Sequence, residues 1–381
     1  MHAIQKNIVD HIFKPQFVSL SFLIILFIFS GCKKESENDY QASSSNLEDA
    51  KADIIVHAGG SIQAAVNAAA PNSLIKIEPG TYSESITVSK PGIKLVGITK
   101  NGEGVVIKNP GDEENGITVD GAGDGFTLQN VTIKNFEENG VVLDSVDNFK
   151  ISHVTAINNG EYGIFPVHSS HGVVEYCTAR GHTDTGIYVG QSTDVVMRCN
   201  TAFANVNGLE VENSSHVNVI NNECYNNVCG MLIDLLPQKD IKTSNDVHVA
   251  SNHVYRNNHA NFGDSGSLES VVPPGLGILV LGADNTTVEK NTVTGNDFAG
   301  ITVFSTLVLV SLGGISADSI DVEPNPDGAF IHNNFVKNNG ANPPPLDLPG
   351  VDLLWDGSGI NNCWKNNEFK TSAPSPLPSC N

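Results

Sequence analysis

The sequence is short of basic residues, of charge in general and of long apolar segments. Of its 381 residues only 21 are Lys or Arg, against 42 Asp or Glu, so the formal net charge at pH 7 is −21. A chain this acidic repels nucleic-acid phosphates and anionic lipids, which argues against a nucleic-acid partner. It would also repel an acidic polysaccharide unless bound cations intervened. Charged residues make up only 17% of the chain, which favours strands and turns over long surface helices.

Two common motifs are missing as well. None of the seven cysteines forms a CxxC pair, so a zinc site has little support. The LxxLxL pattern of leucine-rich repeats is also missing, together with the helical segments that accompany it.

The N-terminal segment has the composition of an export signal. Two lysines precede the apolar run 17–29, which is too short for a comfortable membrane span. The run ends in FSGC, which resembles the lipobox of bacterial lipoproteins, with Cys32 as the lipidated residue. The resemblance implies a signal peptide over 1–31 and a lipid-anchored protein of the bacterial cell envelope. A lysine directly after the lipidated cysteine, as at Lys33, resembles the sequence of lipoproteins that are sorted to the outer membrane. An ordinary signal peptide, or an anchor helix with a chance cysteine, remains the alternative.

Six cysteines follow the lipidation candidate, an even number that permits disulfides in an oxidising compartment. A bond between Cys363 and Cys380 would close the C-terminal tail onto the body of the protein. The remaining four are expected to be buried small hydrophobes; they are Cys177, Cys199, Cys224 and Cys229.

A repeat of 22 to 24 residues runs through the middle of the chain. Each unit opens with Gly-apolar-x-apolar and holds three short pieces of alternating apolar residues with turns between them. The opening glycines are Gly116, Gly140, Gly163, Gly186, Gly208, Gly277 and Gly300. Such regularity predicts an all-β solenoid in which each unit buries its apolar face on its neighbours. We expect one such domain over 54–372, after a disordered tether over 32–53 and before a tail over 373–381.

Recurrent asparagines stand near the end of the second piece, where amides can hydrogen-bond from unit to unit in a ladder. They are Asn200, Asn222, Asn252, Asn291, Asn334 and Asn367. At the N-terminal end, Ser61 is expected to cap a short helix that covers the first unit. Two units are enlarged by insertions, 235–276 and 305–349, and long insertions on a solenoid usually shape a binding surface on one side.

Because the units repeat in register, equivalent positions form columns. Counting the opening glycine as zero, positions one and three face the interior and positions two and four face outward. In the middle units these two columns contain Phe165, Tyr188, Glu210, Glu212 and Asp234. Position five adds His168, Gln191 and Asn213, and Tyr162 directly precedes its glycine, so aromatic, acidic and amide side chains gather on one outward face. Apolar ring faces beside carboxylates and amides suit a sugar-binding groove. An ordinary exposed sheet face remains the alternative.

A second column precedes the glycines by two residues and contains Glu138, Glu161 and Asp184. Three carboxylates one unit apart repel one another. They therefore either splay into solvent or bind a hard cation such as Ca²⁺ between them.

The repeats and the capping start SIQAAVNAAAPNSLIKIEPGTY resemble the parallel β-helix repeat family, which includes pectate lyases, alginate-modifying enzymes and copper-associated periplasmic proteins. The resemblance implies a single-stranded right-handed parallel β-helix with an N-terminal capping helix. The segment YGIFPVHS, which starts at Tyr162, also resembles the YGIDPHD motif of mannuronan C5-epimerases. Phe165 stands where that motif has its catalytic aspartate, a departure that argues against epimerase activity.

These observations predict an exported β-helix that binds polysaccharide, either a lyase or epimerase acting on uronate polymers or a non-catalytic glycan-binding or protein-binding solenoid. A metal-handling protein is a weaker third hypothesis. Lyase and epimerase chemistry needs an acid, a base and a group that neutralises the substrate carboxylate. The candidates for acid and base are Tyr188, His168, Glu210, Glu212 and Asp234, and Arg180 is the nearest basic residue. Glu210 and Glu212 would also suit the paired carboxylates of a glycosidase.

Overall fold

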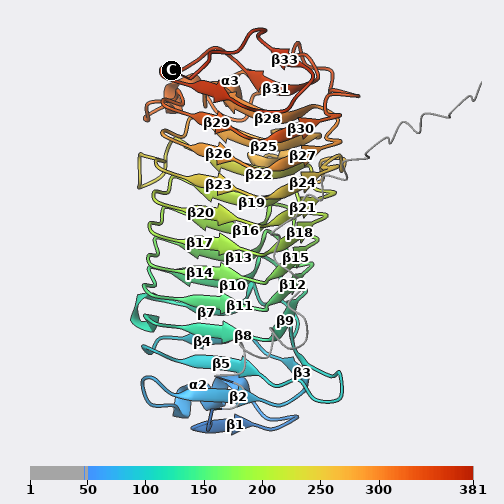
Figure 1. Ribbon diagram of the computed structural model, residues 1–381. Coiled ribbons are helices and arrows are strands. Elements are labelled where there is room, and N and C mark those ends of the chain that lie inside the picture. Colours follow the sequence, from blue (N-terminus) through green and yellow to red (C-terminus); the bar gives the residue numbers. More distant parts are fainter. Residues whose placement is uncertain (1–46, 48–49, 381) are drawn as a thin grey trace, which may run out of the picture. The chain divides into compact units, whose positions relative to one another are not determined.

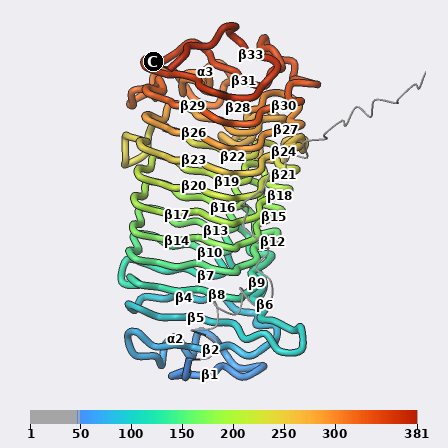
Figure 2. The backbone as a smooth tube through the Cα atoms, viewed as in Figure 1, coloured from blue at the N-terminus to red at the C-terminus, as the bar shows by residue number. Residues whose placement is uncertain are grey.

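The computed structural model describes Leu47 and residues 50–380. Short strands wind in successive coils, and strands of neighbouring coils pair in parallel into three sheets (Figure 1). The chain is therefore a right-handed parallel β-helix, as the repeat and the resemblance predict. Figure 2 shows the coils following one another along the stack from the N-terminal to the C-terminal end. Cys32 and the predicted signal peptide lie outside the described residues. Among the described residues no helix is long and apolar enough to cross a membrane.

The three sheets take one strand each from most coils, and we number them 1 to 3. Sheet 1 contains β1 (Ile54–Val56), β2 (Leu74–Ile77), β5 (Lys94–Gly97), β8 (Thr127–Gln129), β11 (Lys150–Ser152), β14 (Val173–Glu175), β17 (Val196–Arg198), β20 (Asn218–Ile220), β23 (His248–Ala250), β26 (Thr287–Glu289), β29 (Phe330–His332) and β32 (Cys363–Lys365). Sheet 2 contains β3 (Gly80–Ser83), β6 (Val105–Lys108), β9 (Val131–Lys134), β12 (Thr155–Ile157), β15 (Thr178–Arg180), β18 (Thr201–Phe203), β21 (Glu223–Tyr225), β24 (His253–Tyr255), β27 (Thr292–Thr294) and β30 (Phe335–Lys337).

Sheet 3 has the longest strands and carries the outward face on which the sequence places the candidate site. It contains β4 (Ile86–Val88), β7 (Asn115–Val119), β10 (Asn139–Asp144), β13 (Tyr162–Val167), β16 (Thr185–Gly190), β19 (Asn207–Glu212), β22 (Cys229–Asp234), β25 (Leu276–Leu281), β28 (Ala299–Phe304), β31 (Val351–Trp355) and β33 (Ser372–Ala373).

The main hydrophobic core fills the inside of the coils. Positions one and three after the repeat glycines point inward, as predicted: Ile187, Val189, Leu209 and Val211 are at most 1% exposed. Each such side chain contributes about 1.5–3 kcal/mol through burial. Every coil repeats this arrangement, and the alternation of inward and outward positions in sheet 3 follows from it.

Two asparagine ladders run along the stack inside the turns. The predicted ladder is confirmed, because each side-chain amide from Asn200 to Asn334 donates to the amide oxygen of the next asparagine at 2.9–3.1 Å. A second ladder, not predicted, runs from Asn205 to Asn339 with Nδ2–Oδ1 distances of 2.9–3.1 Å and ends on a carboxylate oxygen of Asp352. The ladders satisfy buried turn backbone groups that would otherwise destabilise the fold.

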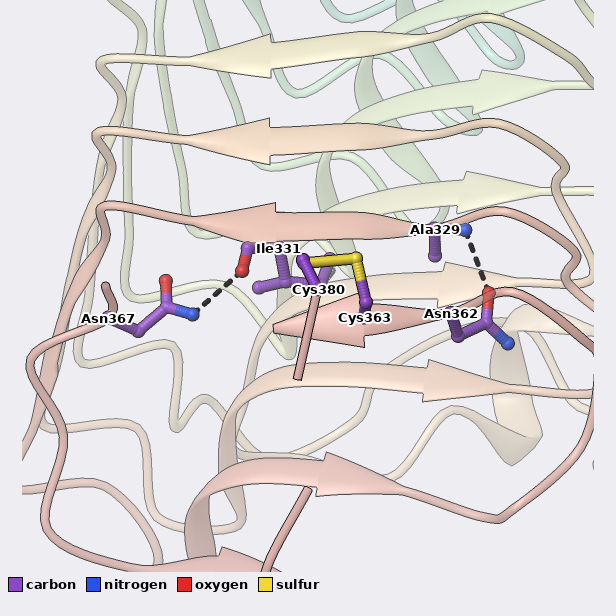
Figure 3. The surroundings of a disulfide bond; sticks show 6 residues. All are labelled: Ala329, Ile331, Asn362, Cys363, Asn367 and Cys380. Carbon is purple, nitrogen blue, oxygen red and sulfur yellow. Dashed lines mark hydrogen bonds between the residues drawn. A yellow bond between two sulfur atoms is a disulfide. The ribbon is translucent and has the colours of Figure 1, made fainter. Parts of the chain in front are cut away.

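Both ends of the stack are covered. Helix α2 (Ile62–Ala68) lies at the first coils, and its N-cap Ser61 accepts a hydrogen bond from the Ala64 amide at 3.0 Å. At the other end, Cys363 and Cys380 form a disulfide that joins the tail to β32 (Figure 3). Cys177, Cys224 and Cys229 are buried free thiols, in keeping with the expectation of small hydrophobes. The expectation is wrong for Cys199, which is only partly buried and is disulfide-bonded.

The two insertions cover part of the outer face of sheet 3. The first insertion, 235–276, contains the 3₁₀ turn η2 (Glu269–Val271), and the second, 305–349, contains α3 (Val308–Ser311) and the 3₁₀ turn η3 (Ala317–Ser319); another 3₁₀ turn, η1 (Gly121–Gly123), lies near the N-terminal coils. Apolar residues of both insertions pack on the outward positions of the later strands in a second core, whose buried members are Cys229, Leu232, Leu236, Leu276, Leu279, Leu281, Phe298, Ala299, Phe304, Leu309, Val351 and Leu354.

Candidate functional site

The strand register of sheet 3 aligns the predicted outward columns. Tyr188 on β16 stands opposite Glu210 on β19, and Glu212 stands opposite Asp234 on β22. These side chains point away from the interior of the coils, as the alternation predicts. Carboxylates from three outward positions on two adjacent strands therefore meet at one place on sheet 3.

The prediction of an open groove at this place is wrong. Tyr188, Glu210, Glu212 and Asp234 are at most 3% exposed, because the first insertion folds back over them directly after β22. The side chains face outward from the coils but are enclosed between sheet 3 and the insertion. The site is thus a buried acidic group and not a solvent-lined face.

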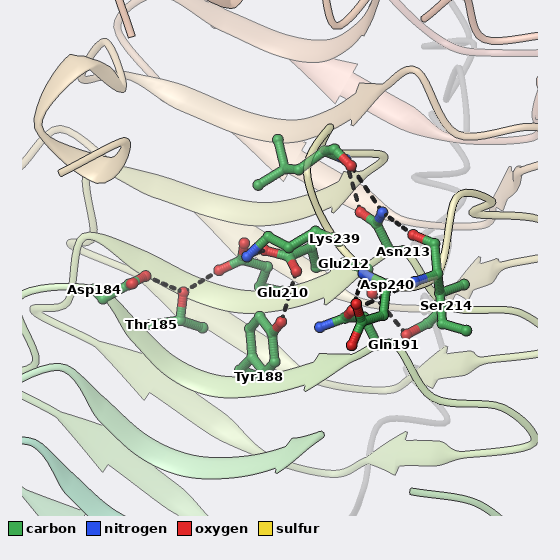
Figure 4. A network of polar contacts seen from close by, with 12 residues as sticks. Asp184, Thr185, Tyr188, Gln191, Glu210, Glu212, Asn213, Ser214, Lys239 and Asp240 are labelled. Atoms are coloured by element: carbon green, nitrogen blue, oxygen red, sulfur yellow. Dashed lines mark hydrogen bonds and ion pairs between the residues drawn. The ribbon is translucent and has the colours of Figure 1, made fainter. Parts of the chain in front are cut away.

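Glu212 is the best-satisfied carboxylate of the group (Figure 4). The Tyr188 hydroxyl donates to its Oε1 at 2.8 Å, and the Lys239 ammonium lies 3.1 Å from its Oε2. Lys239 comes from the first insertion, and its side chain is 35% exposed. It therefore lies at the border between the buried carboxylates and solvent.

Glu210 is held by neighbouring polar side chains. It is close to the Thr185 hydroxyl and accepts from the Asn207 amide at 3.3 Å. The same Thr185 hydroxyl lies 2.9 Å from Asp184 Oδ1, so a chain of polar contacts links Asp184 to Glu210 (Figure 4).

Asp234 differs from the other two carboxylates of the group. It is fully buried, and neither of its carboxylate oxygens has a hydrogen-bond partner. Oδ1 of the buried Asn207 also has no partner. One oxygen each of Glu210, Glu212 and Asp234 lie within 4.8 Å of one another. A buried carboxylate without a partner is costly, so this arrangement requires either bound protons or a cation.

Burial raises the pKa of Glu210 and of Asp234 well above the usual carboxyl range, and the neighbouring carboxylates raise both further. Burial and the Glu212 carboxylate likewise raise the pKa of Tyr188 well above its ordinary value. For Lys239, burial lowers the pKa, but the nearby carboxylates, Glu212 first, outweigh it and the net shift is upward. Burial and the neighbouring carboxylates therefore favour the protonated forms of Glu210 and Asp234, and they keep the Tyr188 hydroxyl a proton donor.

The aromatic side chains form one cluster at the edge of the buried group. The ring centroids of Tyr162 and Phe165 are 4.4 Å apart, and the Phe165 ring stacks on Tyr188 at 4.7 Å. Tyr162 and Phe165 are partly exposed, whereas Tyr188 is covered. The apolar surface available to a ligand is therefore provided by Tyr162 and Phe165.

His168 lies apart from the carboxylate group. Its Nδ1 is 3.2 Å from Asp144 Oδ1, and the two side chains are 37% and 58% exposed. His168 therefore belongs to the open part of the sheet 3 surface, near Phe165 in sequence.

Gln191 and Asn213 hold the first insertion in place. Gln191 Oε1 accepts from the Asp240 amide at 2.9 Å, and the Asn213 side chain bonds the backbone of Leu236 and Ile241 at 2.6–2.8 Å (Figure 4). The sequence placed both residues in a ligand-binding face. Their polar atoms instead bind the loop 236–241.

Arg180 does not reach the site. It lies on β15 in sheet 2, between Ile157 and Phe203 of the neighbouring strands. The cation at the site is Lys239, which the sequence analysis missed. The available signal was its position in LLPQKD, directly after the acidic end of β22.

The column of Glu138, Glu161 and Asp184 is stacked through the backbone, since the Asp184 amide donates to the Glu161 carbonyl at 3.2 Å. Their side chains diverge, however: Glu161 is exposed, whereas Asp184 is buried and bonded to Thr185. Within residues 50–380, the acidic triplets whose oxygens come close enough for a cation lie elsewhere. One is Glu210, Glu212 and Asp234, and the other is Asp284, Glu323 and Asp327.

A cavity of about 60 Å³ adjoins the acidic group under the insertions. Its walls are mostly leucine, valine and phenylalanine side chains from sheet 3 and both insertions, and its polar lining includes Asn207, Glu210, Asp234 and Glu269. This volume has room for a few water molecules but not for a sugar ring.

Comparisons with known proteins agree with the fold. Residues 93–236 match the family model described as right handed beta helix region, and no curated protein matches the chain. Among solved structures, the A-module of mannuronan C-5 epimerase AlgE4 from Azotobacter vinelandii is 16% identical, with a TM-score of 0.57 over 82% of this chain and 93% of that one. The AlgE6 A-module from the same organism is 15% identical, with a TM-score of 0.56 over 82% and 94%. The alginate lyase from Paenibacillus sp. str. FPU-7 is 14% identical, with a TM-score of 0.50 over 81% and 99%.

Proposed function

For this right-handed parallel β-helix protein we propose a role in binding and processing an acidic polysaccharide, at the outer face of sheet 3 around β13, β16 and β19. The observation that carries the proposal is the contact of Tyr188 and Lys239 with the same carboxylate, Glu212. An acid, a base and a cation are thereby adjacent, beside a pair of aromatic rings. Fold-level likeness to proteins named as alginate lyase and mannuronan epimerases supports the substrate class by analogy only.

The proposed chemistry is proton abstraction beside a uronate carboxylate. Glu212, which accepts hydrogen bonds from two donors, is the base that takes the substrate proton. Tyr188, kept protonated by burial, is the acid, and Lys239 neutralises charge on the substrate. Glu210 and Asp234 lie beside these three residues, and their carboxylates raise the pKa values of Tyr188 and Lys239 further.

Substrate approaches from the open part of the face. Tyr162 and Phe165 offer partly exposed ring surfaces there, and Lys239 marks the boundary of the covered part. Access to Tyr188 and Glu212 requires the loop 236–241 to move, which means breaking its bonds to Gln191 and Asn213. Lids that cover catalytic groups until substrate binds are common in enzymes.

A second candidate is a non-catalytic glycan-binding or protein-binding solenoid. The burial of Tyr188, Glu210, Glu212 and Asp234 favours it, because a ligand resting on the closed structure contacts only Tyr162, Phe165 and the exposed polar residues beside them. In that case the acidic group is structural.

A panel of polysaccharides separates the two candidates. Turnover is followed by unsaturated products in the ultraviolet and by new reducing ends, and binding is measured in parallel. Tyr188→Phe removes the acid but keeps the ring, so it should reduce turnover about 100-fold or more while leaving binding nearly unchanged. The control is Tyr255→Phe, which removes a hydroxyl that donates to Glu223 at 3.0 Å on sheet 2, and it should retain full turnover.

Each result of the panel has a distinct reading. Binding without turnover by the wild-type protein supports the second candidate. If no polysaccharide in the panel is bound or altered, the proposed function and the glycan-binding form of the second candidate are both contradicted.

We also propose that the protein is a lipoprotein of the bacterial cell envelope, anchored through Cys32, with no other membrane contact. The FSGC sequence after a short apolar run supports this proposal. Envelope polysaccharide is then accessible without further transport.

A further inference from the structure

We propose that Glu210, Glu212 and Asp234 bind one Ca²⁺ ion between the outer face of sheet 3 and the first insertion. The site differs from the column of Glu138, Glu161 and Asp184 that the sequence suggested. The proposal does not depend on the proposed function, since the ion would neutralise these three buried carboxylates whether or not the protein acts on polysaccharide.

The spacing of the oxygens fits calcium. Ca²⁺–oxygen bonds are about 2.3–2.6 Å long, so two oxygens on opposite sides of the ion lie about 4.6–5.2 Å apart. One oxygen from each of Glu210, Glu212 and Asp234 lies within 4.8 Å of the other two. The three carboxylates can therefore reach one ion without any movement of the strands that carry them.

Buried oxygen atoms without hydrogen-bond donors also belong to this group of residues. Asp234 is fully buried, and both of its oxygens lack a hydrogen-bond donor. Oδ1 of Asn207 is also buried without a donor, while its Nδ2 is 3.3 Å from Glu210. Native proteins rarely leave several buried acceptors unsatisfied. A cation between the three carboxylates would satisfy Asp234, and the oxygen of Asn207, whose side chain lies beside Glu210, is a hard donor of the same kind.

The charges of the group balance with one divalent ion. Three ionised carboxylates and the Lys239 ammonium leave a net charge of about −2. Asp184 and Glu269 add further negative potential around Glu210 and Asp234, because each acts on one or both of them. The adjoining cavity, about 60 Å³, has room for water ligands that would complete the coordination.

The chemistry of the ligands selects the metal. Carboxylate and amide oxygens are hard donors, and the described residues of the group include no histidine or cysteine ligand, which disfavours zinc and copper. Mg²⁺ needs shorter bonds of about 2.0–2.1 Å and gives up its water reluctantly. Three buried carboxylates on adjacent strands therefore favour Ca²⁺ over Mg²⁺, zinc and copper.

The second acidic triplet provides a matched control. Asp284, Glu323 and Asp327 also lie within 4.8 Å of one another, but Glu323 is exposed. Backbone amides of Asp327 and Ile360 donate to Asp284 and Asp327 at 2.9 and 2.7 Å. This triplet is satisfied by the chain itself, so it carries no proposal.

The test is calcium titration of the purified protein after exhaustive treatment with EDTA, by calorimetry and by thermal unfolding. The wild-type protein should bind one Ca²⁺ per chain, and its melting temperature should rise by several degrees. Asp234→Asn keeps the shape of the side chain and should weaken calcium binding at least 100-fold and abolish the rise. Glu323→Gln, in the second triplet, should behave as the wild type does.

Two results would overturn the proposal. One is a stripped wild-type protein that binds no calcium and melts at the same temperature with and without it. The other is an Asp234→Asn protein that binds one Ca²⁺ as tightly as the wild type. If Asp234→Asn does not fold, Glu210→Gln replaces it in the same comparison, with the same expected loss.

Discussion

At the scale of single residues, Lys239 is the side chain on which the site most depends and the one that the sequence did not reveal. Positions within the repeat could be placed in advance, because alternation along a strand fixes which way Tyr188, Glu210 and Glu212 point. Lys239 comes from an insertion that has no period, so no column contains it. Arg180, the nearest basic residue in the sequence, belongs to a different sheet.

Replacing Lys239 with methionine should destabilise the protein by about 2 kcal/mol, because Glu212 is left buried without its cation. The matched change is Lys242→Met in the same insertion. Lys242 pairs with Asp321, and both side chains are about 40% exposed, so this change should cost clearly less stability than Lys239→Met. Urea unfolding at pH 7 measures both. If both variants lose the same free energy of unfolding, the Lys239–Glu212 pair stabilises the protein no more than the exposed Lys242–Asp321 pair does.

At the scale of elements, the coils could be predicted from the sequence, whereas the packing of the two insertions over sheet 3 could not. The 22-to-24-residue period fixed the strands and the first asparagine ladder, since each coil repeats the same inward positions. The second ladder was missed because its asparagines stand among other polar turn residues and become distinct only when the register is known. The insertions bury the site through a shared hydrophobic cluster that includes Leu236 of the first insertion and Leu309 of the second. Residues so far apart in the sequence give no periodic signal.

The second ladder begins at Asn205, because the preceding coil has His182 at the equivalent position. The backbone amide of His182 donates to Asn205 Oδ1 at 3.2 Å, as a ladder asparagine would. Its ring, however, gives no acceptor to the Asn159 amide, whose Nδ2 is buried without a partner. Burial also lowers the pKa of His182 to about 4. The ring therefore stays neutral in the folded protein at pH values where it is charged in the unfolded chain.

His182→Asn should extend the ladder to Asn159 and remove this pH dependence. An unfolded histidine binds a proton below about pH 6.5, whereas the buried ring does not until about pH 4. The wild-type protein therefore loses stability as pH falls through this window, by about 2 kcal/mol at pH 5. The advantage of the variant over wild type in urea unfolding should be larger at pH 5 than at pH 8. An advantage that is the same at both pH values would contradict this reading.

At the scale of the whole molecule, the sequence predicted a β-helix domain and, before it, an export signal and tether. The resemblance of the repeats gave the handedness and the fold. It did not give an activity, because the fold hosts many and the epimerase-like segment has Phe165 in place of the aspartate. What remained beyond reach was whether the outward face is open, which depends on how two aperiodic insertions pack.

The proposed anchor is tested by Cys32→Ser. Without the thiol no lipid can be attached, so the protein should move from the membrane fraction to the soluble fraction while the domain stays folded. Fractionation with immunoblotting shows the distribution, and circular dichroism of the released protein checks the β-structure. A variant that stays in the membrane fraction would identify residues 17–29 as an uncleaved anchor helix.

The central claim is that an acidic polysaccharide binds at the outer face of sheet 3 and displaces the loop held by Gln191 and Asn213. Hydrogen–deuterium exchange of the protein with and without oligomeric alginate tests it most directly. We expect the ligand to slow exchange in β13 and β16 and to change exchange in the loop 236–241, with no change in sheet 1 strands such as β14 and β17. Exchange that alginate leaves unaltered throughout, or alters only in sheets 1 and 2, would contradict the account.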